Sequence, residues 1–365
     1  MKKVYLKAYL KRNLGDDLFL KILCERYNCS FIINNNPRIK YKGFCNNLTS
    51  NNSLIIYSIY KLLSMFFQDY NFLEKRIARK CDLMVTIGGS IFIENSAQSQ
   101  EQLKRICDIY NLKIDKLILG ANFGPYKTKE FKQVIEQKIF NNCIDISFRD
   151  NYSYKLFSSL ANVRSNPDII FSLNINKLTL KNEKKVVISV INCKNRDIDS
   201  KMYENKIVEL IKYFDSEEYE TVLMSFCQYE GDEEAIENIF DKIKYEKFKK
   251  NISKYFYRND IDQALEVLAK SSIIVGSRFH ANILGLKMKK IIVPIAYSDK
   301  TVNALNDLGY KGKIYDARNL NCFVLNDEFK KNLKYKCDVS NVVFESEKHF
   351  EKLDSILPRR RKNGK

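Results

Sequence analysis

The chain has 365 residues and a net charge of +18, from 62 lysines and arginines against 44 acidic residues. Hydrophobic residues make up 45% and charged residues 29%, values typical of a globular protein, which exclude a disordered or fibrous chain. At about 150 residues per domain, the length predicts two domains.

The sequence also indicates the cellular compartment of the protein and whether it binds a metal. The longest apolar stretch, Ser53–Phe67, is interrupted by Lys61 and is shorter than the roughly 18 residues that cross a bilayer. Lys7 lies within the N-terminal apolar run, which argues against a secretory signal peptide. Ten cysteines without a Cys-x-x-Cys pair, and only His280 and His349, leave little for a zinc site. We therefore expect buried free cysteines, no metal and a cytoplasmic protein.

In chain order, short apolar runs alternate with longer amphipathic stretches. The expected strands are Val4–Leu10, Leu83–Ile87, Lys116–Gly120, Asp145–Phe148, Val186–Ile191, Thr221–Phe226, Ser272–Val275 and Lys290–Ile295. The expected helices are Leu18–Tyr27, Ser99–Tyr110, Lys129–Phe140, Lys201–Phe214, Asp260–Ala269 and Asn282–Leu286. Continuous apolar strands separated by helices indicate parallel sheets covered on both faces. The pattern predicts an α/β fold with two doubly wound, Rossmann-like domains.

The polar segment Asn174–Lys185 lacks helical periodicity and is typical of a linker between such domains. We expect an N-terminal domain over residues 1–175 and a C-terminal domain over residues 186–345. Residues 346–365 would form a C-terminal helix and a basic tail.

The polar residues and glycines that directly follow strands are the candidates for ligand binding, because ligands of doubly wound folds bind at the carboxyl ends of the strands. They are Asn13, Gly15, Asp16, Gly88, Gly89, Ser90, Asn122, Gly124, Arg149, Ser277, Arg278, His280, Tyr297 and Lys300. Structural interpretations stay open for several of them. Asp16 or Asp17 would cap the first helix, Arg149 would pair with a carboxylate, and His280 would be a packed core histidine.

Taken in order, these motifs resemble the polysaccharide pyruvyl transferase family. The matching elements are Asn13-x-Gly15-Asp16, Gly88-Gly89, Gly120-x-x-x-Gly124-Pro125, Arg149-Asp150, Asn166-Pro167-Asp168, Ser277-Arg278-x-His280-Ala281 and Tyr297-x-x-Lys300 with Leu308-Gly309. The resemblance implies a glycosyltransferase-B-like fold with the active site in a cleft between the domains. It also implies transfer of a pyruvyl group from phosphoenolpyruvate to paired hydroxyls of a sugar, which forms a cyclic ketal and releases phosphate.

The chain departs from the family pattern at two places. Ser90 stands where the family often has a third glycine. No clear arginine lies in the first strand of the second domain, so Lys194 or Arg196 would have to serve if a further cation is needed. The acceptor sugar, the ketal position and the oligomeric state do not follow from the sequence.

The resemblance implies roles for the candidate residues. Histidine is the side chain whose ordinary pKa lies near neutrality, so His280 would carry the proton chemistry, and Arg278 would act with it. Arg278, Lys300 and Arg149 would bind the anionic groups of phosphoenolpyruvate, the remaining candidates would bind substrate, and no cofactor or metal is needed. The N-terminal domain would hold the acceptor and the C-terminal domain the donor. His349 is expected to tolerate substitution.

Other functions are weighed against this interpretation. A nucleotide-sugar-dependent glycosyltransferase of the same fold is the main alternative, followed by a catalytically silent relative. A nucleic-acid binder is disfavoured because the 22 tyrosines and 23 phenylalanines are dispersed along the chain. The acceptor would be a lipid-linked or other precursor of a cell-surface or cell-wall exopolysaccharide. Segment Ser53–Phe67 and the basic tail would then contact an anionic membrane peripherally, or the segment would be buried in the core.

Overall fold

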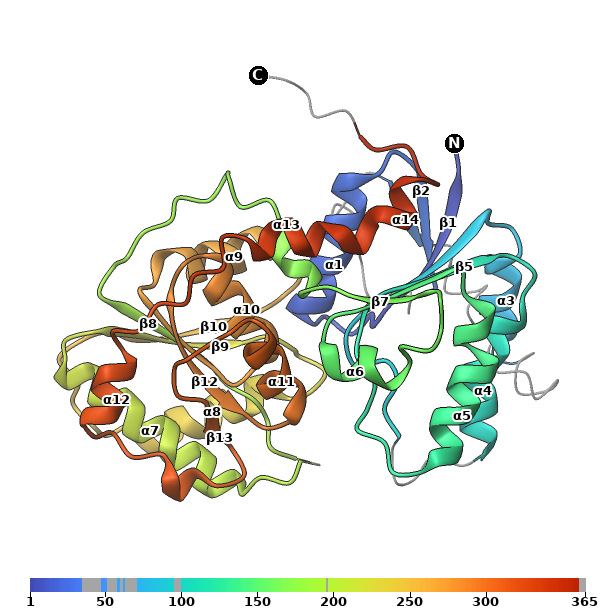
Figure 1. Cartoon of the computed structure of the whole chain (residues 1–365). Helices are drawn as coiled ribbons and strands as arrows, with labels where there is room; N and C mark the ends of the chain where they lie inside the picture. The colour runs from blue at the N-terminus through green and yellow to red at the C-terminus, as the bar shows by residue number, and fades with distance from the viewer. Residues whose placement is uncertain are drawn as a thin grey trace. The chain divides into compact units, whose positions relative to one another are not determined.

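A computed structural model of the chain describes residues 1–34, 47–50, 58–59, 62, 71–94, 100–194 and 196–360 (Figure 1). The chain divides into two compact units. Unit 1 comprises residues 1–10, 19–169 and 345–365, and unit 2 comprises residues 11–18 and 170–344. Most of the apolar stretch at residues 53–67, and the last five residues of the basic tail, lie outside the described residues.

Unit 1 contains a seven-stranded parallel sheet with the strand order β3-β2-β1-β4-β5-β6-β7. The strands are β1 Lys3–Lys7, β2 Ser30–Ile33, β3 Leu48–Ser50, β4 Leu83–Ile87, β5 Asp115–Ala121, β6 Asp145–Phe148 and β7 Val163–Ser165. The four strands expected in this half are present within three residues of their predicted ends. The three strands that the sequence pattern missed, β2, β3 and β7, have four residues or fewer.

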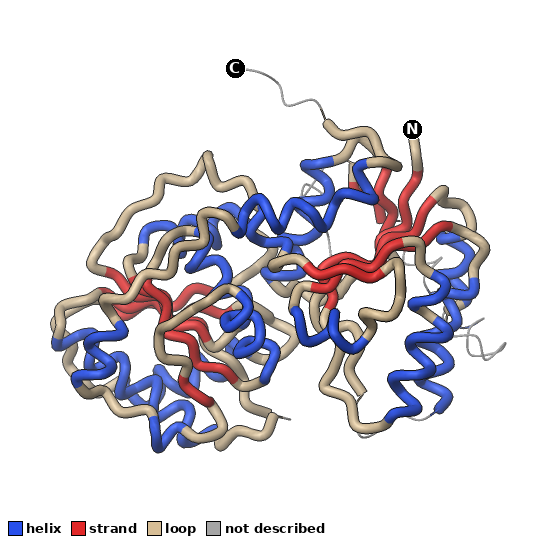
Figure 2. The backbone as a smooth tube through the Cα atoms, viewed as in Figure 1, coloured by secondary structure: helices blue, strands red, loops and turns tan. Residues whose placement is uncertain are grey.

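The helices of unit 1 cover both faces of its sheet (Figure 2). They are α1 Leu14–Arg26, which begins in unit 2, α3 Phe72–Ala78, α4 Gln100–Asp108, α5 Lys129–Lys138, α6 Asn151–Leu156, and the C-terminal α13 Val342–Glu347 and α14 Glu351–Asp354. Apolar side chains of α3, α4 and α5 pack with one face of the strands in a single aromatic-rich core. This burial is the main source of stability for such a layered unit.

Unit 2 contains a six-stranded parallel sheet with the order β10-β9-β8-β11-β12-β13. The strands are β8 Lys185–Ser189, β9 Glu220–Ser225, β10 Ile252–Phe256, β11 Ile273–Gly276, β12 Ile291–Ala296 and β13 Tyr315–Asp316. The helices are α7 Ser200–Ser216, α8 Asp232–Ile243, α9 Ile261–Lys270, α10 Phe279–Lys287, α11 Asp299–Asp307 and α12 Asp327–Asn332. Helices α7 and α8 pack on one face, and α9 and α10 contact the strands from the other (Figure 1). The α/β prediction with two doubly wound units is confirmed.

The course of the chain differs from the expected division at residues 1–175 and 186–345. The turn before α1 joins unit 2, because the Leu14 amide donates to the Phe226 carbonyl and Asn13 forms a β-bridge with Cys227. The segment after residue 344 returns to unit 1, where Arg26 forms two hydrogen bonds with Asp354 of α14. The expected linker, residues 174–185, lies within unit 2, and strand β8 begins at its last residue.

The expectation that His349 tolerates substitution is wrong for this fold. Its side chain is fully buried in unit 1. The Nε2 atom lies 2.8 Å from the Pro167 carbonyl and the Nδ1 atom 2.7 Å from the Ser147 hydroxyl. Burial, and to a smaller extent the nearby charge of Arg164, together lower the pKa of His349 to about 4. A histidine held in this way is a neutral core residue.

The remaining expectations concern cysteines, metals and membranes. Seven of the nine described cysteines are buried, and all nine are free. In the described part of the chain, no three histidine, cysteine or acidic side chains are grouped so as to hold a metal ion. No helix within the described ranges is long and apolar enough to cross a membrane.

Candidate active site

The expected site residues of unit 2 lie where its strand order reverses. Strand β8 is paired with β9 on one side and β11 on the other, so connections leave in opposite directions from this point. In doubly wound folds such a switch point leaves a place for ligands at the carboxyl ends of the strands. The loops that follow β8, β9, β11 and β12 supply the polar residues described below.

The corner between β11 and α10 is fixed to the neighbouring elements by hydrogen bonds. The Arg278 amide donates to the Ser189 hydroxyl at the end of β8, at 3.0 Å. The Ser277 hydroxyl lies 2.8 Å from the Tyr203 hydroxyl on α7, and both groups are buried. The backbone at this corner is therefore held in place before any ligand binds.

The Arg278 side chain is paired with two carboxylates. Its Nε donates to Asp232 Oδ2 at 3.0 Å, its Nη2 contacts Asp232 Oδ1, and its Nη1 donates to Glu230 Oε2 at 2.6 Å. The side chain is only 7% exposed. Burial alone would lower the pKa of Arg278, but the charges of Asp232 and Glu230 raise it well above its usual value. The expected anion-binding arginine thus has internal partners in the free protein.

A second arginine shares one of these carboxylates. Arg196 Nη2 donates to Glu230 Oε2 at 2.6 Å, and its guanidinium carbon lies 5.1 Å from the centre of the Tyr297 ring. Lys300 Nζ lies 5.5 Å from the same ring centre. Burial raises the pKa of Glu230, but Arg278, Arg196 and Lys300 together bring it below its usual value. Between Lys194 and Arg196, the structure places Arg196 in this cluster.

Sequence reasoning missed the two acidic members, Glu230 and Asp232. Glu230 lies in the loop between β9 and α8, and Asp232 is the first residue of α8. One feature of the sequence could have identified them. They are acidic residues that come soon after a buried strand, in a chain with a net charge of +18. Asp232 also accepts hydrogen bonds from the Phe226 and Cys227 backbone amides. It therefore positions both the loop after β9 and the Arg278 side chain.

His280 lies against the first turn of α1. A Cβ atom added to Gly15 would lie 1.7 Å from His280 Nδ1, so the imidazole occupies the space that a side chain would need. Asn13 Oδ1 accepts a hydrogen bond from the Gly15 amide at 3.0 Å, and Asp16 lies half-buried in the same turn. The structure therefore brings Asn13, Gly15 and Asp16 together with His280 within unit 2.

The capping interpretation of this turn needs a correction. Helix α1 begins at Leu14, so Asp16 and Asp17 are in its first turn, and Asn13 precedes it. Asp17 is fully buried, and its Oδ2 accepts a hydrogen bond from the Tyr257 hydroxyl at 2.7 Å. Burial raises the pKa of Asp17 to about 8, although the bond from Tyr257 opposes the shift.

The expected residues of unit 1 form a cluster at the carboxyl ends of the neighbouring strands β4, β5 and β6. Arg149, directly after β6, donates from Nη1 to Asp168 at 3.0 Å and from Nη2 to Asn122 Oδ1 at 2.8 Å. The Arg149 and Asp168 side chains are 3% and 1% exposed. A Cβ atom on Gly89 would lie 2.2 Å from Arg149 Nη2, so the guanidinium group packs directly on this glycine. Of the two interpretations of Arg149, the structure shows the carboxylate pairing.

The other members of this cluster surround Asn122. The backbone amide of Asn122 donates to the Gly89 carbonyl at 2.8 Å, and the Ser90 hydroxyl lies 3.5 Å from the side-chain oxygen of Asn122. Gly88 and Gly124 both have positive φ angles, of 146° and 97°, a conformation that favours glycine. The candidate residues thus fall into a unit 1 cluster around Arg149 and a unit 2 cluster around Arg278.

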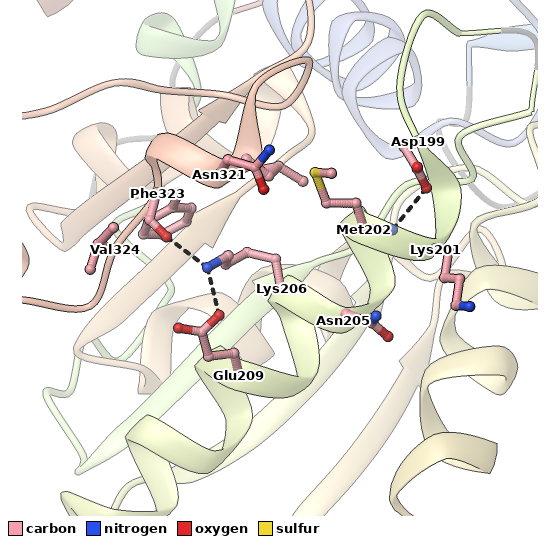
Figure 3. A pocket seen from close by; sticks show the side chains of 10 residues that line it. Asp199, Lys201, Met202, Asn205, Lys206, Glu209, Asn321, Phe323 and Val324 are labelled. Carbon is pink, nitrogen blue, oxygen red and sulfur yellow. Dashed lines mark hydrogen bonds and ion pairs between the residues drawn. The ribbon is translucent and has the colours of Figure 1, made fainter.

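A pocket of about 470 Å³ in unit 2 is lined by residues outside the unit 2 cluster (Figure 3). It is lined by the first half of α7 and by residues 320, 321, 323 and 324, and it contains none of the expected site residues. Lys206 crosses it and donates to the Phe323 carbonyl at 2.6 Å and to Glu209 at 2.5 Å. These contacts satisfy the lysine internally, so the pocket adds no chemistry to the candidate site.

The fold is that of two-domain, glycosyltransferase-B-like proteins with doubly wound domains. The family model for polysaccharide pyruvyl transferase matches residues 13–299. The chain therefore belongs to the polysaccharide pyruvyl transferase family. No protein of curated function matches the chain in sequence.

Solved structures with similar folds include UDP-GlcNAc 2-epimerases. The chain is similar to the UDP-GlcNAc 2-epimerase from Neisseria meningitidis bound to UDP-GlcNAc, with a TM-score of 0.60 and 11% identity over 98% of this chain and 99% of that chain. It is also similar to the UDP-GlcNAc 2-epimerase from Methanocaldococcus jannaschii, with a TM-score of 0.58 and 11% identity over 97% of this chain and 99% of that chain. At this identity the likeness establishes the fold alone.

Proposed function

We propose that the protein transfers a pyruvyl group from phosphoenolpyruvate to paired hydroxyls of a sugar, forming a cyclic ketal and releasing phosphate. The sugar belongs to a cell-surface polysaccharide or its precursor. Family membership supports the reaction class. The observation that carries the donor assignment is the unit 2 cluster, in which Arg196, Arg278 and Lys300 gather at the ends of neighbouring strands.

The donor has the charges that such a cluster attracts. Phosphoenolpyruvate carries a carboxylate and a phosphate, and guanidinium and ammonium groups at a half-buried site bind both strongly. Arg278 is held rigidly by Asp232, so its remaining N–H groups have a fixed direction. Lys300 and Tyr297 border the same site, and the Ser277 backbone belongs to the fixed corner. The scheme requires no metal or other cofactor.

The chemistry requires a group that gives and takes a proton. C3 of the enol gains a proton, which makes C2 electrophilic, and an acceptor hydroxyl oxygen then bonds to C2 as its O–H bond breaks. The second hydroxyl attacks in the same way, and the bond from C2 to the phosphate oxygen breaks. His280 suits the transfer to C3, and Gly15 leaves the space in which its imidazole lies.

The unit 1 cluster is proposed to bind the acceptor. Gly88, Gly89 and Gly124 bring backbone groups close to any ligand, and Ser90 and Asn122 add hydroxyl and amide groups that suit a sugar. A lipid-linked acceptor would place the protein at the cytoplasmic face of an anionic membrane, with contact through residues 53–67 and the basic tail. Flotation with anionic vesicles at low salt tests this contact, and absence of binding would favour a soluble acceptor.

A glycosyltransferase that uses a nucleotide sugar is the second candidate. It is favoured by the fold likeness to the Neisseria meningitidis UDP-GlcNAc 2-epimerase, whose structure contains UDP-GlcNAc. The two functions differ in the donor. Thermal shift or calorimetric titration with phosphoenolpyruvate and with UDP-GlcNAc separates them, because only the true donor should bind in the absence of an acceptor.

The direct test is a product assay. The protein is incubated with phosphoenolpyruvate and a panel of lipid-linked and nucleotide-linked sugars, and both phosphate release and the mass of each sugar are measured. The proposal expects phosphate release that depends on one acceptor, together with the mass gain of a pyruvyl ketal on that acceptor. A glycosyl mass gain with UDP-GlcNAc, and none with phosphoenolpyruvate, would contradict it.

A further inference from the structure

Tyr297 occupies an unusual electrostatic position. It directly follows β12 and is half-buried, with its ring packed partly against the core of unit 2. Arg196 and Lys300 lie 5.1 Å and 5.5 Å from its ring centre. Arg278 and Glu230 also act on it electrostatically, so loops after β8, β9 and β11 and helix α11 all bring a charged group to this ring. Three of those four groups are cations.

The hydroxyl of Tyr297 also differs from those of three fully buried tyrosines. Tyr203 lies against Ser277, Tyr257 donates to Asp17, and Tyr110 lies against Thr86. None of the described residues forms a hydrogen bond with the Tyr297 hydroxyl. A half-buried phenol that contributes nothing to the internal hydrogen-bond network is available to a ligand.

The charges around Tyr297 favour its ionised form. Burial by itself raises the pKa of this phenol, and Glu230 acts in the same direction. Lys300, Arg278 and Arg196 outweigh both and bring the pKa below its usual value. For Tyr203 and Tyr110, in contrast, burial raises the pKa above the usual value. The phenol of Tyr297 can therefore lose its proton more readily than those of the core tyrosines.

We propose that Tyr297 is a catalytic base of the candidate site, which accepts the proton of an acceptor hydroxyl as that oxygen bonds to C2 of the donor. This assignment rests on the proposed function. Activated phenols serve as proton carriers in enzymes when their surroundings tune them to the task. The four groups around Tyr297 belong to the cluster that binds the donor, so the base and the reacting carbon would share one site.

The proton balance of the reaction supports two carriers. Two acceptor O–H bonds, the C2–C3 π bond and the C2–O bond to phosphate break, while two C2–O bonds to the acceptor, one C3–H bond and one O–H bond on the phosphate form. His280 gives the proton to C3 and is restored by the proton of one hydroxyl. Tyr297, as phenolate, takes the proton of the other hydroxyl and passes it to the departing phosphate oxygen. Both residues then regain their starting states.

A spectroscopic titration tests this assignment without turnover. Tyrosine ionisation is followed in the ultraviolet absorbance of the full chain, with Tyr245→Phe as the matched control because Tyr245 is 89% exposed and also lies near a lysine. One tyrosine should ionise below the usual value of about 10, and Tyr297→Phe alone should remove that step. Inorganic phosphate or phosphoenolpyruvate should move the step to higher pH, since a bound anion disfavours the phenolate. An unchanged first step in Tyr297→Phe overturns the assignment.

Kinetics complete the test. In single turnovers at saturating phosphoenolpyruvate, Tyr297→Phe should lower the rate by roughly 10²–10⁴, while donor affinity stays nearly the same. The wild-type rate should rise with pH as the phenol ionises, and Tyr297→Phe should remove that rise. A normal rate and pH profile would overturn the assignment. If wild-type protein performs no pyruvyl transfer with any acceptor, the proposed function fails. The anion-linked ionisation of Tyr297 would then still identify a reactive tyrosine in an anion site, and its absence would leave Tyr297 without a chemical role.

Discussion

Both units place an arginine at the carboxyl end of a parallel strand, yet the two arginines are in different electrostatic settings. In the unit 1 cluster, Arg149 is paired with the single buried carboxylate of Asp168 and with the amide oxygen of Asn122. In the unit 2 cluster, Arg278 is paired with the two carboxylates of Asp232 and Glu230. A second arginine, Arg196, shares the Glu230 carboxylate, and Lys300 lies close by. Each arginine thus follows a parallel strand, but the strands are not equivalent in the two sheets and the surrounding charges differ.

The difference in charge bears on which of the two clusters would bind an anionic ligand. A buried one-to-one ion pair leaves little net charge for a ligand, and its removal leaves an unpaired buried carboxylate. A half-buried cluster with three cations and two carboxylates retains a positive charge that can attract an anionic donor. This difference supports the proposal that unit 2 binds the anionic donor and carries the proton chemistry, while unit 1 offers neutral hydrogen-bonding groups.

The largest effect is expected for His280→Gln. Glutamine can form hydrogen bonds but cannot exchange a proton near neutral pH, so the single-turnover rate at saturating phosphoenolpyruvate should fall by roughly 10²–10⁴. The donor affinity and the thermal melting temperature should change much less. A normal rate would remove His280 from the mechanism, whereas a collapsed melting temperature would identify it as a packed core histidine.

Substitution of Gly15 tests the contact that positions His280. In Gly15→Ala, the new methyl group would occupy the space of His280 Nδ1, so the imidazole must move. Because alanine favours the helix by about 1 kcal/mol over glycine, the fold should tolerate the change. We expect a rate loss that approaches that of His280→Gln without a large drop in melting temperature. Full activity in Gly15→Ala would show that the position of the imidazole is not critical.

His349 provides the matched comparison in unit 1. His349→Gln should leave the chemistry unaffected but destabilise the fold, since it disturbs two buried hydrogen bonds. The wild-type protein should also lose stability as the pH falls from 6.5 towards about 4, because the unfolded histidine binds a proton that the folded one resists. The contribution lost is about 3 kcal/mol at most. Melting temperatures across this range check it, and a pH dependence that persists in His349→Gln would contradict it.

A smaller effect is expected at Glu230. Its carboxylate accepts hydrogen bonds from both Arg278 and Arg196 at 2.6 Å, where an anionic ligand would compete with it. Glu230→Gln removes one negative charge from the cluster and should tighten phosphoenolpyruvate binding by about two- to fivefold, equivalent to roughly 0.5–1 kcal/mol. Weaker binding, measured by calorimetry, would show instead that Glu230 is needed to orient the arginines.

The sequence predicted the strands of both sheets well, because a parallel strand covered on both faces leaves a continuous apolar run. Strands β4 and β6 have the predicted bounds. The pattern failed for β10, whose residues are only partly buried, and for the two-residue β13. It also placed residues 11–18 in the wrong unit, because the backbone bond from Leu14 to Phe226 joins residues far apart in the sequence.

The site was predictable in its residue types but not in its pairings. Glycines and polar residues after strands marked Gly15, Gly89, Arg149 and the corner at Arg278 from the sequence alone. The carboxylates that neutralise each arginine were not recognisable as partners, since Asp168 follows Arg149 by 19 positions and Asp232 precedes Arg278 by 46. The strand order of the sheet determines which charged residues lie together at the strand ends. That order cannot be inferred from a local sequence pattern.

The most direct test of the account is the affinity for phosphoenolpyruvate of two matched variants, Arg278→Lys and Arg149→Lys. Both keep the charge and lose the planar guanidinium fork. Calorimetric titration, with a thermal melt of each variant, should show clearly weakened binding for Arg278→Lys and an unchanged affinity for Arg149→Lys. Unchanged affinity in Arg278→Lys, or a loss confined to Arg149→Lys, would contradict the assignment of the donor to unit 2.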